Sequence, residues 1–351
     1  MAEPLAPRKA VFEMAPYSPP TSGRAGKLRL DFNENTVGAS PRVVEFLKQR
    51  LSESGLAVYP EYEETRPKLA VFFGVGEGEL LLTNGTDEAI QILINTYVDG
   101  GEDVLLLHPS YAMYRFYAEV AGAAIREVGY RPEDLSFPLE ELLEELRPET
   151  RALLIANPNN PTGTGVGIEG IRCILGRAPH AAVLVDEAYY EFSGVTALGL
   201  LPEFPNLFVS RTFSKVYGMA AMRLGCLFSH GRNIQYLHKA QSPYSVNALA
   251  ALAAQAAIED TDYIRDYVSE VLAARQMLCE GFSQRGIACY QSQANFVLFR
   301  AGARAIEIRD YLREKGVLVR DRSYELPGCV RVTAGTREQI ARFFQMLDEV
   351  W

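Results

Sequence analysis

Short apolar runs recur along the middle of the chain, separated by segments of helical or loop character. The runs are Asp103–Leu107, Ala124–Val128, Ala152–Ala156, Ala182–Val185, Leu207–Val209 and Leu224–Phe228. Runs that are apolar throughout, without polar alternation, are typical of strands buried on both faces of a parallel sheet. The pattern predicts an α/β domain with a mostly parallel central sheet, whose ligands bind beyond the carboxyl ends of the strands.

The sequence before these runs predicts an arm and two helices. Residues 1–30 are rich in proline, glycine and basic groups, lack apolar periodicity and predict an extended arm. Helical spacing of apolar positions begins near Ser40, with Pro41 in the first turn. A second helix is expected over Glu61–Phe73.

The sequence after residue 245 predicts a smaller α+β unit. A long alanine-rich helical segment covers Val246–Phe282, with a break near Asp260. Beyond it, strands are expected at Ile287–Tyr290, Asn295–Phe299, Val317–Val319 and Cys329–Val332, and helices at Ala303–Lys315 and from Thr336 onward.

The length of the chain favours two domains, because 351 residues exceed the roughly 250–300 residues that one core usually serves. We predict an N-terminal arm over 1–30, a segment joining the small domain over 31–60, a large domain over 61–245 and a C-terminal small domain over 246–351. The large domain would carry the sheet and therefore the ligand site.

Composition and charge exclude several classes of protein. Hydrophobic residues at 48% and charged residues at 23% are ordinary globular values. A formal charge of −9 without a long basic run argues against a nucleic-acid partner. Neither a signal peptide nor a membrane span is expected, which predicts a cytoplasmic protein. The 5 scattered cysteines and 4 histidines lack the spacing of a disulfide framework or a metal site.

Three sequence strings at the ends of predicted elements could bind an anionic or cationic group. The string TNGTDEA at 83–89 places Gly85 and Thr86 at the start of a predicted helix. The free backbone N–H groups there can bind an anion, and we call this site the anion cup. A helix with an ordinary N-cap gives the same sequence pattern. The string NPNNPTG at 157–163 holds Asn160 in a stiff turn after a strand. In the string VLVDEAY at 183–189, Asp186 ends a buried strand. Burying a carboxylate costs free energy unless a cation or a hydrogen-bond donor pairs with it, so Asp186 is expected to bind such a group or to cap a helix.

A fourth string, SRTFSKVYGMAAMRLG at 210–225, combines an amine with groups that suit a phosphate. Lys215 follows the hydroxyls of Thr212 and Ser214, and Arg223 lies eight positions later (215 + 8 = 223). An amine in a partly desolvated pocket near other cations loses its proton more easily, which imine formation requires. A lone lysine is usually a surface residue. The hypothesis that Lys215 is an active-site amine therefore rests on all four strings together.

In this order and spacing, the four strings resemble those of the aspartate-aminotransferase-like (fold type I) enzymes that use pyridoxal 5'-phosphate. The resemblance covers nearly the whole chain and implies that Lys215 forms the Schiff base with the cofactor and carries the substrate proton as base and acid. It also implies that Asp186 pairs with the pyridine nitrogen, that Asn160 and Tyr189 bind the ring oxygen, and that Tyr111 stacks on the ring.

The resemblance further implies a site for the cofactor phosphate and a shared active site. The phosphate would be bound by Gly85, Thr86, Thr212, Ser214 and Arg223. Tyr59, in the string VYPE at 58–61, resembles the tyrosine that reaches this phosphate from a neighbouring subunit. A functional homodimer would follow.

Within this family, five strings resemble those of histidinol-phosphate aminotransferases. They are LDFNEN at 30–35, TFSKVYG at 212–218, QSPYSVN at 241–247, VRDRS at 319–323 and CVRVTAGTR at 329–337. The resemblance implies that Arg331 binds the substrate carboxylate and Arg320 the substrate phosphate, since a guanidinium suits both anions. Tyr17 would reach into the partner's site. Ala221, in place of a usual glycine, and the short segment after Tyr17 depart from the pattern.

The expected reaction is transamination of histidinol phosphate and 2-oxoglutarate to imidazole acetol phosphate and glutamate. Alternatives of the same fold are an aromatic-amino-acid aminotransferase, another phosphate-ester aminotransferase and threonine-phosphate decarboxylase. A cofactor-binding domain of a transcription regulator is disfavoured because the sequence shows no preceding helix-turn-helix segment and no basic module. A nucleotide-binding Rossmann protein is disfavoured because no GxGxxG string follows the first strand.

Overall fold

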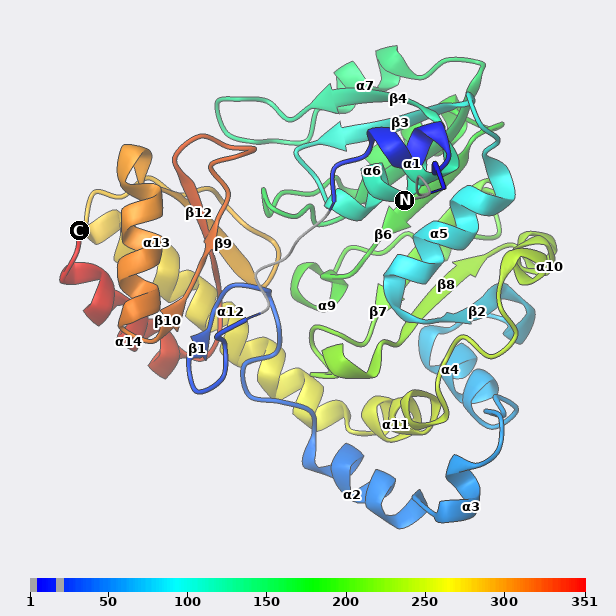
Figure 1. Ribbon diagram of the computed structural model, residues 1–351, viewed down its shortest axis with the longest axis horizontal. Coiled ribbons are helices and arrows are strands. Elements are labelled where there is room, and N and C mark those ends of the chain that lie inside the picture. The colour runs from blue at the N-terminus through cyan, green and yellow to red at the C-terminus, as the bar shows by residue number, and fades with distance from the viewer. Residues whose placement is uncertain (1–4, 17–21) are drawn as a thin grey trace.

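The computed structural model describes residues 5–16 and 22–351, and a seven-stranded sheet lies at its centre (Figure 1). The strands are β2 (Leu80–Thr83), β3 (Asp103–His108), β4 (Ala124–Gly129), β5 (Thr150–Ala156), β6 (Ala182–Asp186), β7 (Leu207–Thr212) and β8 (Gly225–Ser229). Their order is β2-β8-β7-β6-β5-β3-β4, and every neighbouring pair is parallel except the two that involve β8. The mostly parallel α/β sheet is therefore confirmed.

Helices cover both faces of this sheet. They are α5 (Gly85–Tyr97), α6 (Ala112–Ala121), α7 (Leu139–Glu145), α8 (Ile168–Arg177), α9 (Tyr190–Ser193) and α10 (Gly231–Ala240). Leu106 and Leu154 pack with α5, α6 and α10 in one apolar cluster. Leu105 and Leu153 face the other side, in a cluster that includes α7 and α8. Alternate residues of a strand thus bury opposite faces, as the continuous apolar runs require.

A smaller three-stranded sheet lies beside the large one, in the order β11-β12-β9 (Figure 1). Its strands are β9 (Phe296–Arg300), β11 (Arg320–Asp321) and β12 (Cys329–Thr333), all antiparallel to their neighbours. The associated helices are α12 (Thr261–Gln284), α13 (Ala305–Glu314) and α14 (Arg337–Asp348). A parallel pair, β1 (Leu28–Arg29) with β10 (Val317–Leu318), brings the segment after β1 alongside this sheet.

Four further helices lie in the lower part of Figure 1, and the last of them along the chain packs on the first and the third. They are α2 (Pro41–Arg50), α3 (Glu53–Leu56), α4 (Thr65–Phe73) and α11 (Ala248–Glu259). The Ser40 hydroxyl caps α2 by accepting from the Arg42 N–H at 3.1 Å, so the predicted start is confirmed. The predicted break at Asp260 is also confirmed, between α11 and α12.

Several predicted elements differ from the structure. Residues 1–30 are not extended throughout, because α1 (Lys9–Glu13) packs on α6 and β1 pairs with a distant strand. The second helix begins at Thr65 rather than Glu61, since Pro67 has no N–H to donate and fits only the first turn. Residues Ile287–Tyr290 form no strand but a single bridge, Cys289 to Phe299.

Two short strands, β2 and β11, carried no signal in the sequence pattern. A run of two to four residues is too short for its periodicity to separate a strand from a loop.

The predicted domain limits remain a prediction, although all seven strands of the large sheet lie between residues 80 and 229. Within the described residues, no helix combines the length and apolarity needed to cross a membrane.

Candidate functional site

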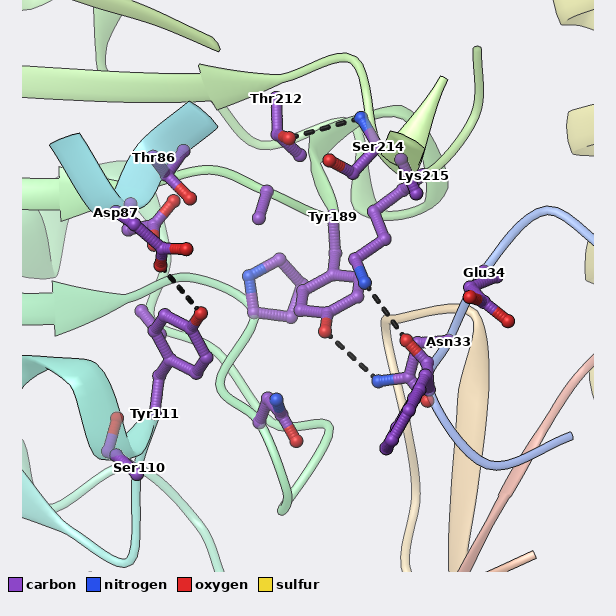
Figure 2. Close-up of a pocket in the computed structure, with 18 of the residues that line it drawn as sticks. Asn33, Glu34, Thr86, Asp87, Ser110, Tyr111, Tyr189, Thr212, Ser214 and Lys215 are labelled. Atoms are coloured by element: carbon purple, nitrogen blue, oxygen red, sulfur yellow. Dashed lines mark hydrogen bonds between the residues drawn. The ribbon is translucent and has the colours of Figure 1, made fainter. Parts of the chain in front are cut away.

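A pocket of about 560 Å³ opens at the carboxyl ends of the central strands (Figure 2). It lies where the strand order reverses, between β3 and β5, which is the usual ligand site of an open α/β sheet. Eleven of the residues singled out from the sequence line it: Thr86, Tyr111, Asn160, Asp186, Tyr189, Thr212, Ser214, Lys215, Arg223, Arg320 and Arg331. Segments far apart in the sequence therefore meet at one site.

Three other predicted site residues lie elsewhere. Gly85 begins α5 beside the pocket, next to the Arg223 guanidinium. Tyr59 is 73% exposed and stacks on Tyr244, with ring centroids 4.3 Å apart, rather than lining this pocket. Tyr17 lies outside the described residues.

Lys215 follows β7 and extends into the pocket toward the segment that precedes α2 (Figure 2). Its Nζ donates a hydrogen bond to the Phe32 carbonyl at 3.1 Å. Burial, together with the charge of Arg331, lowers the pKa of Lys215 to about 8, although Glu34 acts to raise it. A substantial neutral fraction of this amine exists near neutral pH, as a nucleophile or a proton acceptor requires.

Asp186 ends β6 and is 4% exposed. Burial raises the pKa of its carboxyl group to about 6, even though the Tyr114 hydroxyl, which donates to Oδ2 at 2.9 Å, acts to lower it. Its other oxygen, Oδ1, is buried without a hydrogen bond of ordinary geometry among the residues described. A ring N–H meeting Oδ1 would satisfy this atom and keep the carboxylate ionised.

An anion cup surrounds the start of α5. Gly85 has a φ of +72°, and a Cβ there would stand 2.6 Å from the Arg223 guanidinium, so only glycine fits. Asp87 holds Arg223 at 3.1 Å and accepts from the Tyr111 hydroxyl at 2.8 Å. Helix N–H groups, hydroxyls and a guanidinium suit a phosphate, which would compete with Asp87 for Arg223.

Arg331 projects from β12 and is 4% exposed. It donates to the Asn160 side chain and, at 2.6 Å, to the Asp31 carbonyl. Burial lowers its pKa to about 10, helped by the charge of Arg322. Residues 5–16 and 22–351 provide Arg331 with no ion-pair partner, and its Nε makes no hydrogen bond. A desolvated cation without a counter-charge is suited to bind an anion.

The sequence reasoning missed several residues that line the pocket: Phe32, Asn33, Glu34, Asp87, Tyr114, Arg322 and Tyr324. Tyr114 follows Tyr111 by one helical turn, and this spacing was a usable signal. Arg322 is buried and paired with Glu325. Asn33 donates to the Tyr189 hydroxyl at 3.0 Å, a contact that no local pattern indicates.

The comparisons with known proteins agree with this geometry. Residues 25–347 match the family model of aminotransferase class I and II. The chain belongs to this family. It is a pyridoxal-phosphate-dependent aminotransferase, and the orphaned oxygen of Asp186, the cup at α5 and the amine of Lys215 fit that cofactor.

Curated relatives of this aminotransferase match it along most of its length. Histidinol-phosphate aminotransferase 2 of Methylococcus capsulatus is 37% identical, covering 92% of this chain and 90% of the relative. Histidinol-phosphate aminotransferase of Symbiobacterium thermophilum is 36% identical, covering 97% of each. A solved histidinol-phosphate aminotransferase from Sinorhizobium meliloti, in complex with pyridoxal-5'-phosphate, shares the fold, with a TM-score of 0.83 at 23% identity over 92% of each chain.

We expect acylation of Lys215 in the cofactor-free aminotransferase to follow a titration with its midpoint near pH 8. The amine reacts only when neutral, and burial favours that form. Mass spectrometry of the Lys215 peptide after brief acetic anhydride treatment, from neutral to alkaline pH, measures the midpoint. Lys48, exposed on α2, is the reference. Equal midpoints for the two lysines would contradict the desolvation argument.

Proposed function

We propose that this aminotransferase exchanges the amino group between histidinol phosphate and 2-oxoglutarate, giving imidazole acetol phosphate and glutamate in histidine biosynthesis. The observation that carries the proposal is the presence of Arg331 and Arg320, neither with an ion-pair partner among the described residues, in one pocket with Lys215. Relatives at 36–37% identity that are named for this reaction support it.

The bound cofactor would supply an aldehyde carbon for the amine and an electron-withdrawing ring. Asp186 would bind the protonated ring nitrogen through its free oxygen, while Tyr114 holds the other oxygen in place. Arg223, with the hydroxyls of Thr212 and Ser214, would bind the phosphate at the start of α5. Each role matches a group that is already oriented toward the pocket.

Lys215 would serve as nucleophile and then as the base and acid that moves the substrate proton. Its amine must be neutral to accept that proton, and its lowered pKa provides the neutral form. The Phe32 carbonyl holds Nζ in the pocket before substrate binds. Asn160 and Tyr189 line the same cavity and would hold the ring oxygen.

The two arginines would bind the alternating anions. Arg331 would hold the carboxylate of glutamate or 2-oxoglutarate, because it is buried and free of a carboxylate partner within the described chain. Arg320 would hold the phosphate of the histidinol ester. Phe32 lies between β1 and α2 and faces Arg320, whose Cζ is 5.6 Å from the ring centroid.

We also propose a homodimer with shared sites. Exposed apolar side chains occur close to Tyr59 in the sequence, at Leu51, Leu56 and Val58, and the exposed Tyr244 stacks on Tyr59. A second copy would cover this patch and bring Tyr59 to the partner's phosphate site. Sedimentation equilibrium of the holoenzyme should give twice the chain mass, and an active monomer would contradict the proposal.

Further parts of the proposal concern the cellular compartment, the class of substrate and the domain limits. We propose a cytoplasmic enzyme, as expected from the sequence. We also propose that it acts on small molecules rather than on nucleic acid, because the formal charge is −9. We further propose that the large domain covers residues 61–245 and the small domain covers residues 246–351.

A panel of substrates tests the reaction. Glutamate-dependent amination of imidazole acetol phosphate should exceed amination of phenylpyruvate in kcat/KM, with no decarboxylation of threonine phosphate. Lys215→Ala should lower kcat by at least about 1,000-fold, because nucleophile and base are both lost. Borohydride should fix the cofactor to the Lys215 peptide of the wild type. Preference for phenylpyruvate or threonine phosphate defeats the assignment.

Two arginine variants test the anion roles. Arg331→Ala should raise KM for glutamate by about 10- to 100-fold, because hydrogen bonds between charged groups contribute about 1.5–3 kcal/mol. Arg322→Ala should raise it by less, since Glu325 already occupies that guanidinium. Steady-state kinetics of both half-reactions measure the difference. Equal effects of the two variants would show that the carboxylate site is assigned wrongly.

A further inference from the structure

The segment Asp31–Glu34 holds two charged groups of the pocket through its backbone. The Phe32 carbonyl accepts from Lys215 Nζ at 3.1 Å. One residue earlier, the Asp31 carbonyl accepts from the Arg331 guanidinium at 2.6 Å. The position of this segment therefore determines where the amine and the buried guanidinium lie.

Asn33, within the segment, has a φ of +56°, which is uncommon for a residue with a side chain. Its side chain donates to the Tyr189 hydroxyl at 3.0 Å, and its backbone N–H donates to Thr333 Oγ1 at 3.1 Å. The Asn295 side chain donates to the Asn33 carbonyl at 3.1 Å. Backbone strain of this kind persists only where surrounding contacts fix the conformation.

Arg24 clamps both ends of this segment. Its guanidinium donates to the two oxygens of Asp31 at 2.8 and 3.1 Å and to the two oxygens of Glu34 at 2.6 and 3.2 Å. Its Cζ also lies 4.2 Å from the Phe32 ring centroid. The three ionised side chains are mostly buried, with exposures of 15%, 7% and 23% for Arg24, Asp31 and Glu34. A planar, forked cation can satisfy two carboxylates at once, which an ammonium cannot.

The clamp also controls the charge that faces Lys215. Burial acts to raise the pKa of Glu34, but Arg24 outweighs this effect and the net pKa is lowered, so the carboxylate stays ionised. The other charges acting on Lys215 are Arg331 and Arg223, which lower its pKa, and Asp87, which raises it. Arg24 therefore pairs with Glu34, the acidic group of this segment that acts on Lys215.

We propose that Arg24 is a positioning residue of this aminotransferase, which fixes the Asp31–Glu34 segment against Lys215 and Arg331. The inference rests on the proposed function of the pocket. Arg24 does not line the pocket itself and acts through the segment that it clamps. Loss of Arg24 would leave two mostly buried carboxylates uncompensated and release the backbone carbonyls that hold the amine and the guanidinium.

Arg24→Ala and Arg24→Lys test the clamp, with Arg29→Ala as the matched control. Arg29 lies in β1, two residues before the segment, is 48% exposed and meets Glu34 only at 3.8 Å. In Arg24→Ala we expect KM for glutamate to rise by about tenfold, because Arg331 loses its fixed partner. The visible absorption band of the bound cofactor can be titrated with pH. In Arg24→Ala the midpoint of that titration should rise by about half a unit or more, since an unpaired Glu34 favours the protonated form at Lys215. Arg24→Lys should show partial recovery, and Arg29→Ala should stay within about twofold of the wild type.

Combining Arg24→Ala with Glu34→Gln separates the two effects. The visible midpoint should return toward that of the wild type, while the KM defect persists. Equal KM values and midpoints for Arg24→Ala and Arg29→Ala overturn the inference. If Arg24→Ala fails to fold, the same comparison of Arg24→Lys with Arg29→Ala decides.

Hydrogen exchange separates failure of this inference from failure of the proposed function. In the cofactor-free protein, amides of the peptide covering residues 30–35 should exchange faster in Arg24→Ala than in Arg29→Ala. If the wild type neither binds the cofactor nor transaminates, the proposed function fails regardless of this result. If the wild type does both but exchange is unchanged by Arg24→Ala, the clamp fails.

Discussion

The desolvation of charge is the constraint on which this molecule depends. Lys215, Asp186 and Arg331 all project into one pocket, and burial moves the pKa of each toward the neutral form. None of the three forms an ion pair within the part of the chain that the structure describes. An uncompensated buried charge costs stability, and a ligand of complementary charge recovers that cost. The same desolvation makes the amine of the pocket nucleophilic and its guanidinium suited to anions.

The fold brings these charges together by two separate means. The central sheet contributes Asp186 and Lys215, because β6 and β7 are parallel neighbours whose carboxyl ends lie at one edge. The smaller sheet contributes Arg331 from β12. The chain between β1 and α2 joins the two, since the Leu30 carbonyl accepts from the Thr333 N–H at 2.9 Å. The pocket therefore depends on a contact between the two sheets as well as on the strand ends.

The sequence predicted the part of the site that follows from local order along the chain. Asp186 and Lys215 each follow a continuous apolar run, and Thr86 begins an amphipathic helix, so position relative to a strand or helix end was enough to single them out. The parallel pairing of β1 with β10 joins residues almost 290 positions apart and leaves no periodicity in either. The contacts of Asp31 and Phe32 are made by backbone carbonyls, which carry no residue type to recognise.

The charges of the pocket also oppose the charge of the molecule as a whole. The chain carries a formal charge of −9, yet four guanidinium groups line the one pocket, at positions 223, 320, 322 and 331. An acidic surface repels anions in general, while a positive cavity with low-dielectric walls concentrates the field where an anion can enter. Glu325 and Asp87 neutralise two of these groups in the absence of ligand, Arg322 and Arg223. Arg320 and Arg331 form no ion pair within the described residues, so they keep their full attraction for an anionic ligand.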